Sequence, residues 1–384
     1  MIKNRIIFFL LLLFTSCSEN EEFKYVAVVT KSLEYNNANN ATFHGIVENE
    51  SSSEITESGF ILSVRSQDNT GVRLISSDPS QSVLTQSTNY LLPGKEYYLR
   101  AYVVTDGISI YGNELSFKTT GEVNKGQWRE IVQENESGWC VFVRSVFSLG
   151  DNSYFILADK GMYTFNHVSQ TFKLTLQNNI IRSASYGLVY KNEVYVFSTD
   201  RFYKFNPANN TLTGLSARPV SGYRAFHASF VINNEVYIGL GQSPTGYTKD
   251  FWKYNLDTDI WERIADFPGH FRSSPFSFAL GNRGYTGGGY NLIEPQWPYP
   301  KFEDLWQFNP ELDQWTQRES LPIDNEELFD LRGTENAGKG YCFYKKTMWE
   351  YEPTYNYWEP MAELSSNEQF CYPMIFSYNN KVYL

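Results

Sequence analysis

Short segments in which aromatic residues alternate with other residues recur along the second two thirds of the chain. In each segment two aromatic residues stand two positions apart, an Asn or Glu follows, and a large residue stands nine positions after the first aromatic. Such alternation is typical of β-strands with one buried face. The first aromatics are Tyr163, Tyr203, Trp252, Trp306 and Trp349. Their separations of 40, 49, 54 and 43 residues match the size of four-stranded propeller blades.

A second predicted strand lies upstream of each segment and carries an aromatic residue at a recurring place: Phe155, Tyr195, Tyr237, Tyr285, Tyr341 and, as a sixth copy without a downstream partner, Tyr383. We expect each pair of strands to form a hairpin, with Asn and Asp turning the chain and the large residue starting an outer strand. Burial of one Trp removes about 150–250 Å² from water, at most about 4–6 kcal/mol. Most of these aromatics are therefore expected in the core.

The repeat over residues 127–384 resembles the kelch repeat, in which one strand ends in a Gly pair and the next has the pattern Trp-x-Tyr-Asn. Gly239 and Gly241, and Gly287 to Gly289, supply the glycines in two copies. The resemblance implies an all-β protein whose larger part is a six-bladed kelch-type β-propeller. Trp128 to Ile131 resembles an outer strand and is expected to complete the last blade. That blade lacks its third strand, so we expect the natural chain to run about 10–25 residues past Leu384, because open strand edges are avoided.

Residues 24–120 have the strand and turn pattern of an antiparallel β-sandwich. Gly59–Val64 and Tyr97–Val104 are rich in aromatic and aliphatic residues, and Ser, Asn, Asp and Gly turns separate such runs. Leu92 to Tyr102, with its Leu-x-Pro-Gly turn, resembles a fibronectin type III domain, which implies a spacer or binding module. Residues 121–126 are a predicted linker.

The N-terminal segment has the features of a secretory signal. Lys3 and Arg5 precede an apolar run that is too short to span a bilayer. The residues leading into Cys17 resemble the lipobox of bacterial lipoproteins, which implies that 1–16 is a signal peptide and that acylated Cys17 inserts into a lipid bilayer. The alternative is an ordinary signal peptide that leaves Cys17 as a free thiol.

Residues 17–23 form an acidic tether. They resemble the export signal that sends many Bacteroidetes lipoproteins to the outer face of the outer membrane, although a plain flexible tether is an equal alternative. We therefore expect a protein that is anchored by lipid to the outer membrane and faces the cell exterior.

Composition narrows the class of partner. The net charge is −11 and no basic block occurs, which argues against nucleic acid. Charged residues make up 20% of the chain and aromatic residues 17%, so the chain is expected to fold rather than remain disordered. Besides Cys17, the cysteines are Cys140, Cys342 and Cys371. Their spacing predicts neither a metal site nor a disulfide framework.

The loop before Trp306 is the longest of its kind and contains Trp297 and Tyr299 among prolines. Aromatic side chains held rigidly at a surface suit sugar rings or the side chains of a protein partner. The alternative is that they fold onto the neighbouring blade.

Arg182, Arg224 and Arg272 each stand 13 residues before a recurring Tyr. This spacing predicts equivalent places at the start of three consecutive blades. Three such cations would form an anion site for an acidic sugar or an acidic peptide. The alternative is a structural role in which each Arg donates to loop carbonyls.

Candidate catalytic chemistry rests only on the kelch resemblance. Copper-radical oxidases of this fold need two His, two Tyr and a Cys crosslinked to Tyr, and the spacing of His167, His227 and His270 assembles no such group. A kelch sialic-acid mutarotase is a second precedent, and Arg224, His227, His270, Arg272 and Glu294 resemble such a site. We assign no catalytic residue, cofactor or metal.

The sequence therefore favours a surface lipoprotein that binds glycan or protein through the loop face of its propeller. A sugar mutarotase or another carbohydrate-active enzyme is an alternative, as is a structural subunit of an envelope complex.

Overall fold

The structure, a computed structural model, describes residues 25–37, 39–51, 53–127, 143–219, 222–291, 300–323, 331–364 and 374–384. The chain divides into two compact units, Met1–Val123 and Asn124–Leu384. In the described residues both are built from antiparallel strands, and the single helix is the four-residue α1 (Asn179–Arg182). No helix in this part of the chain is long and apolar enough to cross a membrane.

Seven strands make up the described part of the first unit. They are β1 (Val26–Asn37), β2 (Asn40–Asn49), β3 (Ile55–Ser63), β4 (Val72–Ile75), β5 (Val83–Thr88), β6 (Glu96–Thr105) and β7 (Ile108–Lys118). They form two sheets, β1-β2-β5 and β4-β3-β6-β7, which contact each other through β1 with β6 and β7 and through β3 with β5. The predicted β-sandwich is therefore present.

The core of the sandwich is aromatic. The Phe43 and Phe60 rings from the two sheets lie 5.9 Å apart, and Tyr97 stacks on Phe117 at 5.5 Å. The hydroxyl of Tyr97, which is fully buried, accepts the amide N–H of Leu92 at 2.8 Å. The Tyr thus packs back on the turn that precedes its own strand. Membership of the fibronectin type III family stays a prediction.

The second unit consists of successive four-stranded antiparallel sheets, here called blades one to five, followed by a two-stranded hairpin. Blade one is β8 (Val143–Leu149), β9 (Asn152–Leu157), β10 (Gly161–Asn166) and β11 (Thr171–Leu176). Blade two is β12 (Ala184–Tyr190), β13 (Glu193–Ser198), β14 (Arg201–Asn206) and β15 (Thr211–Ala217). Blade three is β16 (Ala228–Ile232), β17 (Glu235–Gly239), β20 (Phe251–Asn255) and β21 (Ile260–Ile264), with the small hairpin β18 (Gln242–Ser243) and β19 (Gly246–Tyr247) inserted after β17.

Blades four and five repeat the same order. Blade four is β22 (Phe276–Leu280), β23 (Arg283–Gly287), β24 (Leu305–Asn309) and β25 (Gln314–Arg318). Blade five is β26 (Arg332–Asn336), β27 (Lys339–Tyr344), β28 (Thr347–Glu352) and β29 (Tyr357–Glu363). The hairpin is β30 (Phe376–Tyr378) and β31 (Lys381–Tyr383), which fits the expected first two strands of a sixth blade.

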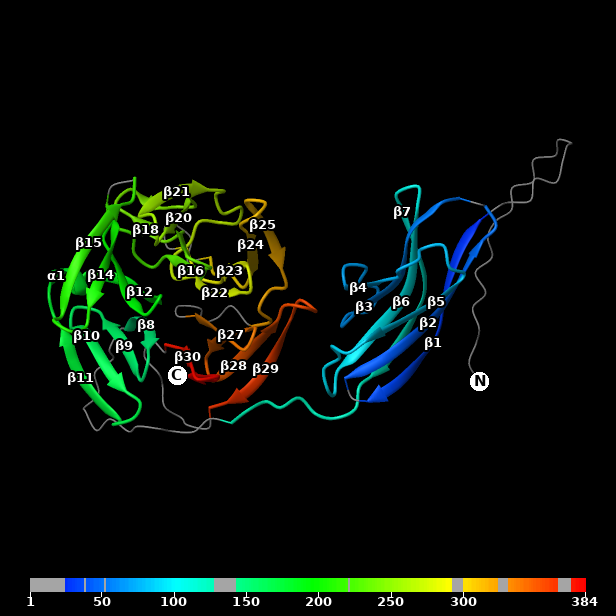
Figure 1. Cartoon of the computed structure of the whole chain (residues 1–384), viewed down its shortest axis with the longest axis horizontal. Helices are drawn as coiled ribbons and strands as arrows, with labels where there is room; N and C mark the ends of the chain where they lie inside the picture. The colour runs from blue at the N-terminus through cyan, green and yellow to red at the C-terminus, as the bar shows by residue number, and fades with distance from the viewer. Residues whose placement is uncertain are drawn as a thin grey trace, which may run out of the picture. The chain divides into compact units, whose positions relative to one another are not determined.

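The blades of this unit stand around a common centre, with the first strand of each blade innermost and the fourth outermost (Figure 1). Inner strands of neighbouring blades contact each other, as β8 does with β12, β16 with β22, and β22 with β26. The hairpin strand β30 contacts both β26 and β8, so it lies between blade five and blade one. The unit is a β-propeller, as predicted.

Strand pairing confirms the nine-residue offset of the sequence pattern. The second aromatic of each segment faces the large residue across the third and fourth strands, as Tyr254 does Trp261, Phe308 does Trp315 and Tyr351 does Trp358. Phe165 with Phe172 and Phe205 with Leu212 are the same pairs in blades one and two. The offset is constant because the turn between these strands has the same length in every blade.

The turn between the third and fourth strands also joins each of blades three, four and five to the preceding blade. In blade four, Asp313 Oδ1 accepts the amide N–H of Ala265 at 2.9 Å, while the indole N–H of Trp315 donates to the carbonyl of Ala265 at 3.1 Å. One residue of blade three is thus bonded at both its N–H and its C=O. We call this pair of hydrogen bonds the turn clamp.

The turn clamp occurs three times in the described residues. Asp259 and Trp261 hold Ser216, and Asn356 and Trp358 hold Glu319, in the same way. The clamping residue always has a positive φ, between 50° and 59°, which Asp and Asn tolerate better than most residues. Blades one and two have Phe172 and Leu212 in place of the Trp, so no indole N–H is available there.

The first blade and the last hairpin meet through aromatic rings. Phe155 lies 5.7 Å from Phe376, and the His167 ring stacks on Tyr378 at 3.9 Å. On the other side of the hairpin, Ile375 packs against the core of blade five. These contacts close the ring among the described residues; the predicted closing strand at Trp128 lies outside them.

We expect Asp313→Ala to lower the free energy of unfolding by about 1–3 kcal/mol, because it leaves a backbone N–H without its acceptor and places Ala at a positive φ. Asp313→Asn should retain most of the stability, since the Asn356 side chain accepts the equivalent backbone N–H in blade five. Glu311→Ala in the same turn is the matched control, and urea denaturation is the measurement. An equal effect of the Asp313→Ala and Glu311→Ala variants would show that the clamp is not stabilising.

Candidate functional site

The predicted site residues do not all lie in the described part of the chain. Trp297 and Tyr299, the predicted aromatic platform, lie outside it, as does Cys17, the predicted lipidation site. Arg182 is exposed at the end of α1, a helix that leads into blade two. This differs from the surroundings of Arg224 and Arg272, so the expected equivalence of the three arginines is wrong for Arg182.

Arg224 is buried in the segment that leads into blade three, with 3% of its surface exposed. Its Nη2 donates to both oxygens of Asp250, at 2.8 and 2.6 Å. Its Nη1 donates to the carbonyl of Leu240 at 2.7 Å and to the hydroxyl of Thr248 at 2.6 Å. The indole N–H of Trp252 completes the site by donating to Asp250 at 2.6 Å. These donors hold the pKa of Asp250 at about 2, although burial opposes them.

Arg272 repeats this arrangement in the segment that leads into blade four. It is fully buried, pairs with Asp304 through Nη1 and Nη2, and donates from Nη1 to the carbonyl of Gly288 at 3.0 Å. Trp306 donates its indole N–H to Asp304 at 2.8 Å. The guanidinium also lies 4.2 Å from the ring centroid of Phe302, a cation–π distance.

The glycines of the sequence pattern serve the same arrangement. Gly288 and Gly289 have φ values of 62° and 84°, and a Cβ on Gly289 would lie 2.4 Å from the carbonyl oxygen of Ser273. Only a residue without a side chain fits there. The resulting turn presents the Gly288 carbonyl to Arg272, and the Leu240 carbonyl, just before Gly241, is presented to Arg224 in the same way.

Arg224 and Arg272 are therefore not the exposed cations that an anion site requires. Each guanidinium is buried and bonded to a carboxylate and to a carbonyl, which are the contacts of the structural alternative. Spacing alone could not reveal this, because the Asp partners stand 26 and 32 residues further along the chain.

His227 bridges the inner ends of blades two and three. Its Nε2 lies 2.9 Å from the Ser185 hydroxyl and its Nδ1 lies 3.2 Å from the carbonyl oxygen of Ala228. Nδ1 must carry the proton that Ala228 accepts, which leaves Nε2 to accept from Ser185. Burial of the ring, with a smaller contribution from the nearby Arg224 and Arg218, lowers the pKa of His227 to about 3. So weak a base is poorly matched to proton transfer at neutral pH.

His270 has a different setting. It is exposed and stacks on the Phe302 ring, whose centroid is 5.5 Å from its own, with the rings 10° from parallel. Its carbonyl accepts the Nε–H of Arg272 at 3.0 Å. The structure thus places His227 and His270 in the segments that lead into two consecutive blades but gives them different partners.

Three exposed aromatic residues lie on these same lead-in segments, and the sequence analysis did not single them out. Tyr223 and Phe226 precede β16, and Phe271 precedes β22; their exposed fractions are 46%, 41% and 37%. The lead-in segments are joined because the Ser274 amide donates to the Phe226 carbonyl at 2.9 Å. We call Tyr223, Phe226 and Phe271 the lead-in aromatics. The signal in the sequence that could have indicated these three residues is their position next to Arg224 and Arg272.

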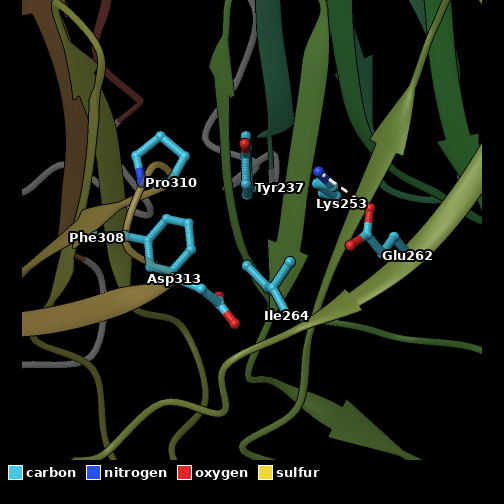
Figure 2. A pocket seen from close by; sticks show the side chains of 7 residues that line it. All are labelled: Tyr237, Lys253, Glu262, Ile264, Phe308, Pro310 and Asp313. Atoms are coloured by element: carbon cyan, nitrogen blue, oxygen red, sulfur yellow. Dashed lines mark ion pairs between the residues drawn. The ribbon is translucent and has the colours of Figure 1, made fainter.

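A small pocket between blades three and four is lined by residues of both blades (Figure 2). Its polar groups already have partners: Lys253 Nζ lies 3.1 Å from Glu262 and 3.4 Å from Glu235, and Asp313 makes the turn clamp. Tyr237 and Phe308 form part of its wall, with ring centroids 5.6 Å apart. We therefore assign this pocket to blade packing.

Among the described residues, no three His, Cys, Asp or Glu side chains are grouped so as to hold a metal ion. Cys342 is a free, buried thiol whose pKa is raised by burial. His167 lies in the turn of blade one, where Ser153 bonds its Nε2 at 2.7 Å.

Comparison with known proteins identifies the repeat. Residues 223–268, which run from the segment before blade three to the segment that follows it, match the kelch motif. Blade three of the β-propeller therefore matches the kelch motif. The matched segment contains Arg224, Asp250 and Trp252.

Several curated proteins are similar to part of this kelch-containing chain. N-acetylneuraminate epimerase of Yersinia enterocolitica is 32% identical over 89 residues, which is 22% of this chain and 21% of that protein. The protein of the same name from Pasteurella multocida is 34% identical over 91 residues, 23% of each. Kelch-like protein 11 of Homo sapiens is 28% identical over 145 residues, 37% of this chain and 18% of that protein. The matches thus span about a fifth of the length of these relatives.

A solved structure, that of YjhT, is also similar. It is 18% identical, with a TM-score of 0.44, and the similarity covers 52% of this chain and 70% of that one.

Arg272→Leu is expected to destabilise the propeller by about 3–5 kcal/mol, because it leaves the Asp304 carboxylate largely buried and without its positively charged partner. Arg283→Leu removes a partly exposed arginine of the same blade, whose ion pair with Glu311 is 3.7 Å long, and should cost less than about 1 kcal/mol. Denaturant unfolding of the two variants separates these outcomes. Similar losses of stability in the two variants would mean that the buried Arg272–Asp304 pair stabilises the propeller no more than an exposed ion pair does.

His227 should make the propeller less stable as the pH falls. Its folded pKa of about 3 lies below the usual 6.5, so the neutral form is favoured in the folded state. The stability is complete above pH 6.5 and declines towards pH 3 by at most about 1.4 kcal/mol per pH unit. We expect His227→Gln to flatten the stability profile between pH 6.5 and pH 4 in comparison with the natural chain. Denaturation curves of both proteins across this range measure the difference.

Proposed function

We propose that the propeller binds a carbohydrate through the face that carries the lead-in segments of blades three and four, with the lead-in aromatics as the contact surface. The observation that supports this best is the exposure of Tyr223, Phe226 and Phe271 on two segments that are hydrogen-bonded to each other. Exposed aromatic rings on a rigid support present apolar area at little cost in conformational entropy. The buried Arg224–Asp250 and Arg272–Asp304 pairs of the same segments supply the rigidity.

Carbohydrate is favoured over a protein partner for two reasons. The lead-in aromatics are only three in number, which suits the faces of one or two sugar rings better than a standard protein interface of about 800 Å² per partner. The partial similarity to proteins named N-acetylneuraminate epimerase also points towards sugars.

The predicted residues Trp297 and Tyr299 belong to the same proposal. They stand in the long loop between the second and third strands of blade four, and they would extend the aromatic surface. Trp297→Ala is the variant that tests them.

We further propose that the protein is attached to the outer membrane through acylated Cys17 and faces the cell exterior. The support is the sequence that precedes Cys17, and labelling with a radioactive or clickable fatty acid tests it. Cys17→Ala should lose the label and leave the membrane fraction; retention of label would contradict the proposal.

Tyr223→Ala and Phe271→Ala are expected to weaken glycan binding at least tenfold, about 1.4 kcal/mol each. A glycan array on the soluble protein identifies the ligand, and calorimetry with that ligand measures the variants. Phe172→Ala is the matched control, since Phe172 is 42% exposed on the outer strand β11 and should bind normally. Unchanged affinity in both lead-in variants would contradict the proposal.

The alternative function is a sugar mutarotase at the same face, and the similarity of about 90 residues to N-acetylneuraminate epimerases favours it. The low pKa of His227 weighs against that residue as the acid–base group. Exchange of the anomers of N-acetylneuraminate, followed by NMR, distinguishes the two functions, because a binding protein leaves the spontaneous exchange rate unchanged.

A further inference from the structure

The hairpin of β18 and β19 is an addition to blade three. In blades one, two and five the second strand passes into the third through a short turn, whereas in blade three this hairpin stands between β17 and β20. A connection between the two strands does not require it, and loops that exceed what a connection needs often bind ligands. What the hairpin contacts and what it presents to solvent therefore decide its role.

Backbone hydrogen bonds fix the hairpin to the lead-in segments. Ala225 and Gln242 donate to each other's carbonyls, at 3.0 and 2.8 Å, and Gln242 pairs with Tyr247 on its other side. The amide of Gly241, at the base of the hairpin, donates to the carbonyl of Arg272 at 2.9 Å. The hairpin and the lead-in segments of blades three and four thus form one hydrogen-bonded unit.

One face of the small sheet around Gln242 is turned to solvent. Residues that pair directly across antiparallel strands place their side chains on the same face, and successive residues of an extended segment place theirs on opposite faces. Arg224 is buried, so Ala225 faces outward. Gln242 and Tyr247 share the face of Ala225. In agreement with this, all three are partly exposed, and Tyr223, on the same side of Arg224 as Ala225, is 46% exposed.

Gln242 stands between the two tyrosines on this outer face. Tyr247 is its direct partner, and Tyr223 is its diagonal neighbour, so the Cβ atoms lie about 5 and 7–8 Å away. Only backbone atoms of Gln242 are hydrogen-bonded within the described residues. The carboxamide, with its acceptor oxygen and two N–H donors, is thus available to a ligand that also contacts a tyrosine ring.

We infer that Gln242 and Tyr247 extend the proposed carbohydrate site and select an uncharged sugar with two neighbouring hydroxyl groups; this inference rests on the proposed function. The carboxamide donates to one hydroxyl of such a pair and accepts from the other. The apolar face of the same sugar ring packs on a tyrosine. A sugar carboxylate is bound most strongly by a guanidinium, but Arg224 is on the buried face of this sheet and already binds Asp250.

A glycan array that carries neutral and sialylated glycans tests the class of sugar. The natural full chain should bind neutral glycans that have two adjacent free hydroxyl groups, and it should bind sialylated glycans no better. Binding that requires a sialylated glycan would overturn the inference and leave the proposed function standing. Binding to no glycan would overturn both.

Gln242→Ala tests the residue, with the neutral glycan that binds best on the array as the ligand. We expect calorimetry to show at least a tenfold rise in Kd, because the sugar hydroxyls lose their partner. Gln314→Ala should bind as the natural chain does, since Gln314 is an exposed glutamine of the outer strand β25. An unchanged Kd in Gln242→Ala would overturn the inference, whereas the proposed function falls only if Tyr223→Ala and Phe271→Ala bind normally as well.

Deoxy analogues of the same glycan separate a direct contact from an indirect effect on the hairpin. Removal of the hydroxyl that Gln242 binds should weaken binding to the natural chain at least tenfold and should have little further effect on Gln242→Ala. Should Gln242→Ala fail to fold, Gln242→Met carries the same comparison, because it keeps the length of the side chain without its hydrogen-bonding groups. Equal losses in the natural chain and the variant, for every hydroxyl removed, would overturn the inference.

Discussion

The propeller depends on the turn clamp, the pair of hydrogen bonds that joins one blade to the preceding blade. In blades three to five, an Asp or Asn in the left-handed conformation accepts a backbone N–H of the preceding blade, and a Trp two residues later donates to the carbonyl of the same residue. The turn clamp requires a turn of fixed length, because the Asp or Asn side chain and the Trp side chain must reach the same residue. It also gives partners to one N–H and one C=O at the end of an outer strand, which the sheet itself leaves unpaired. The constant offset of nine residues in the sequence follows from this geometry.

The charged residues in the segments that lead into blades three and four also serve to hold the fold together. Arg224 and Arg272 each bind a carboxylate, a loop carbonyl and, through the shared Asp, the indole N–H of a Trp. Nearly all the hydrogen-bonding capacity of these groups is consumed within the fold. What remains at the surface of these segments is aromatic rather than charged, namely Tyr223, Phe226 and Phe271. Arg218 differs from these two arginines, since its Nε and Nη1 have no hydrogen-bond partner among the described residues.

Much of the fold could be predicted from the sequence. The spacing of Trp252, Trp306 and Trp349 predicted the blades, and the pairing of Tyr254 with Trp261 confirmed the register. The candidate site was predicted less well. Arg182 shares the spacing of Arg224 but lies exposed on a helix, because blade two has no matching Asp and Gly pair around it. Trp297 and Tyr299 lie outside the described residues, so they stay a prediction.

The sequence by itself determined the class of fold, the spacing and register of the blades and the residues that fill their cores. These features follow from periodic burial and from turns of fixed length, which are local properties of the chain. Only the tertiary structure decided which polar groups are available for function. Arg224 meets Asp250 and His227 meets Ser185 across 26 and 42 residues, and Arg218 is left without a full set of acceptors because another arginine already holds the same carboxylate. Such pairings depend on how neighbouring blades pack, and no local pattern reports them.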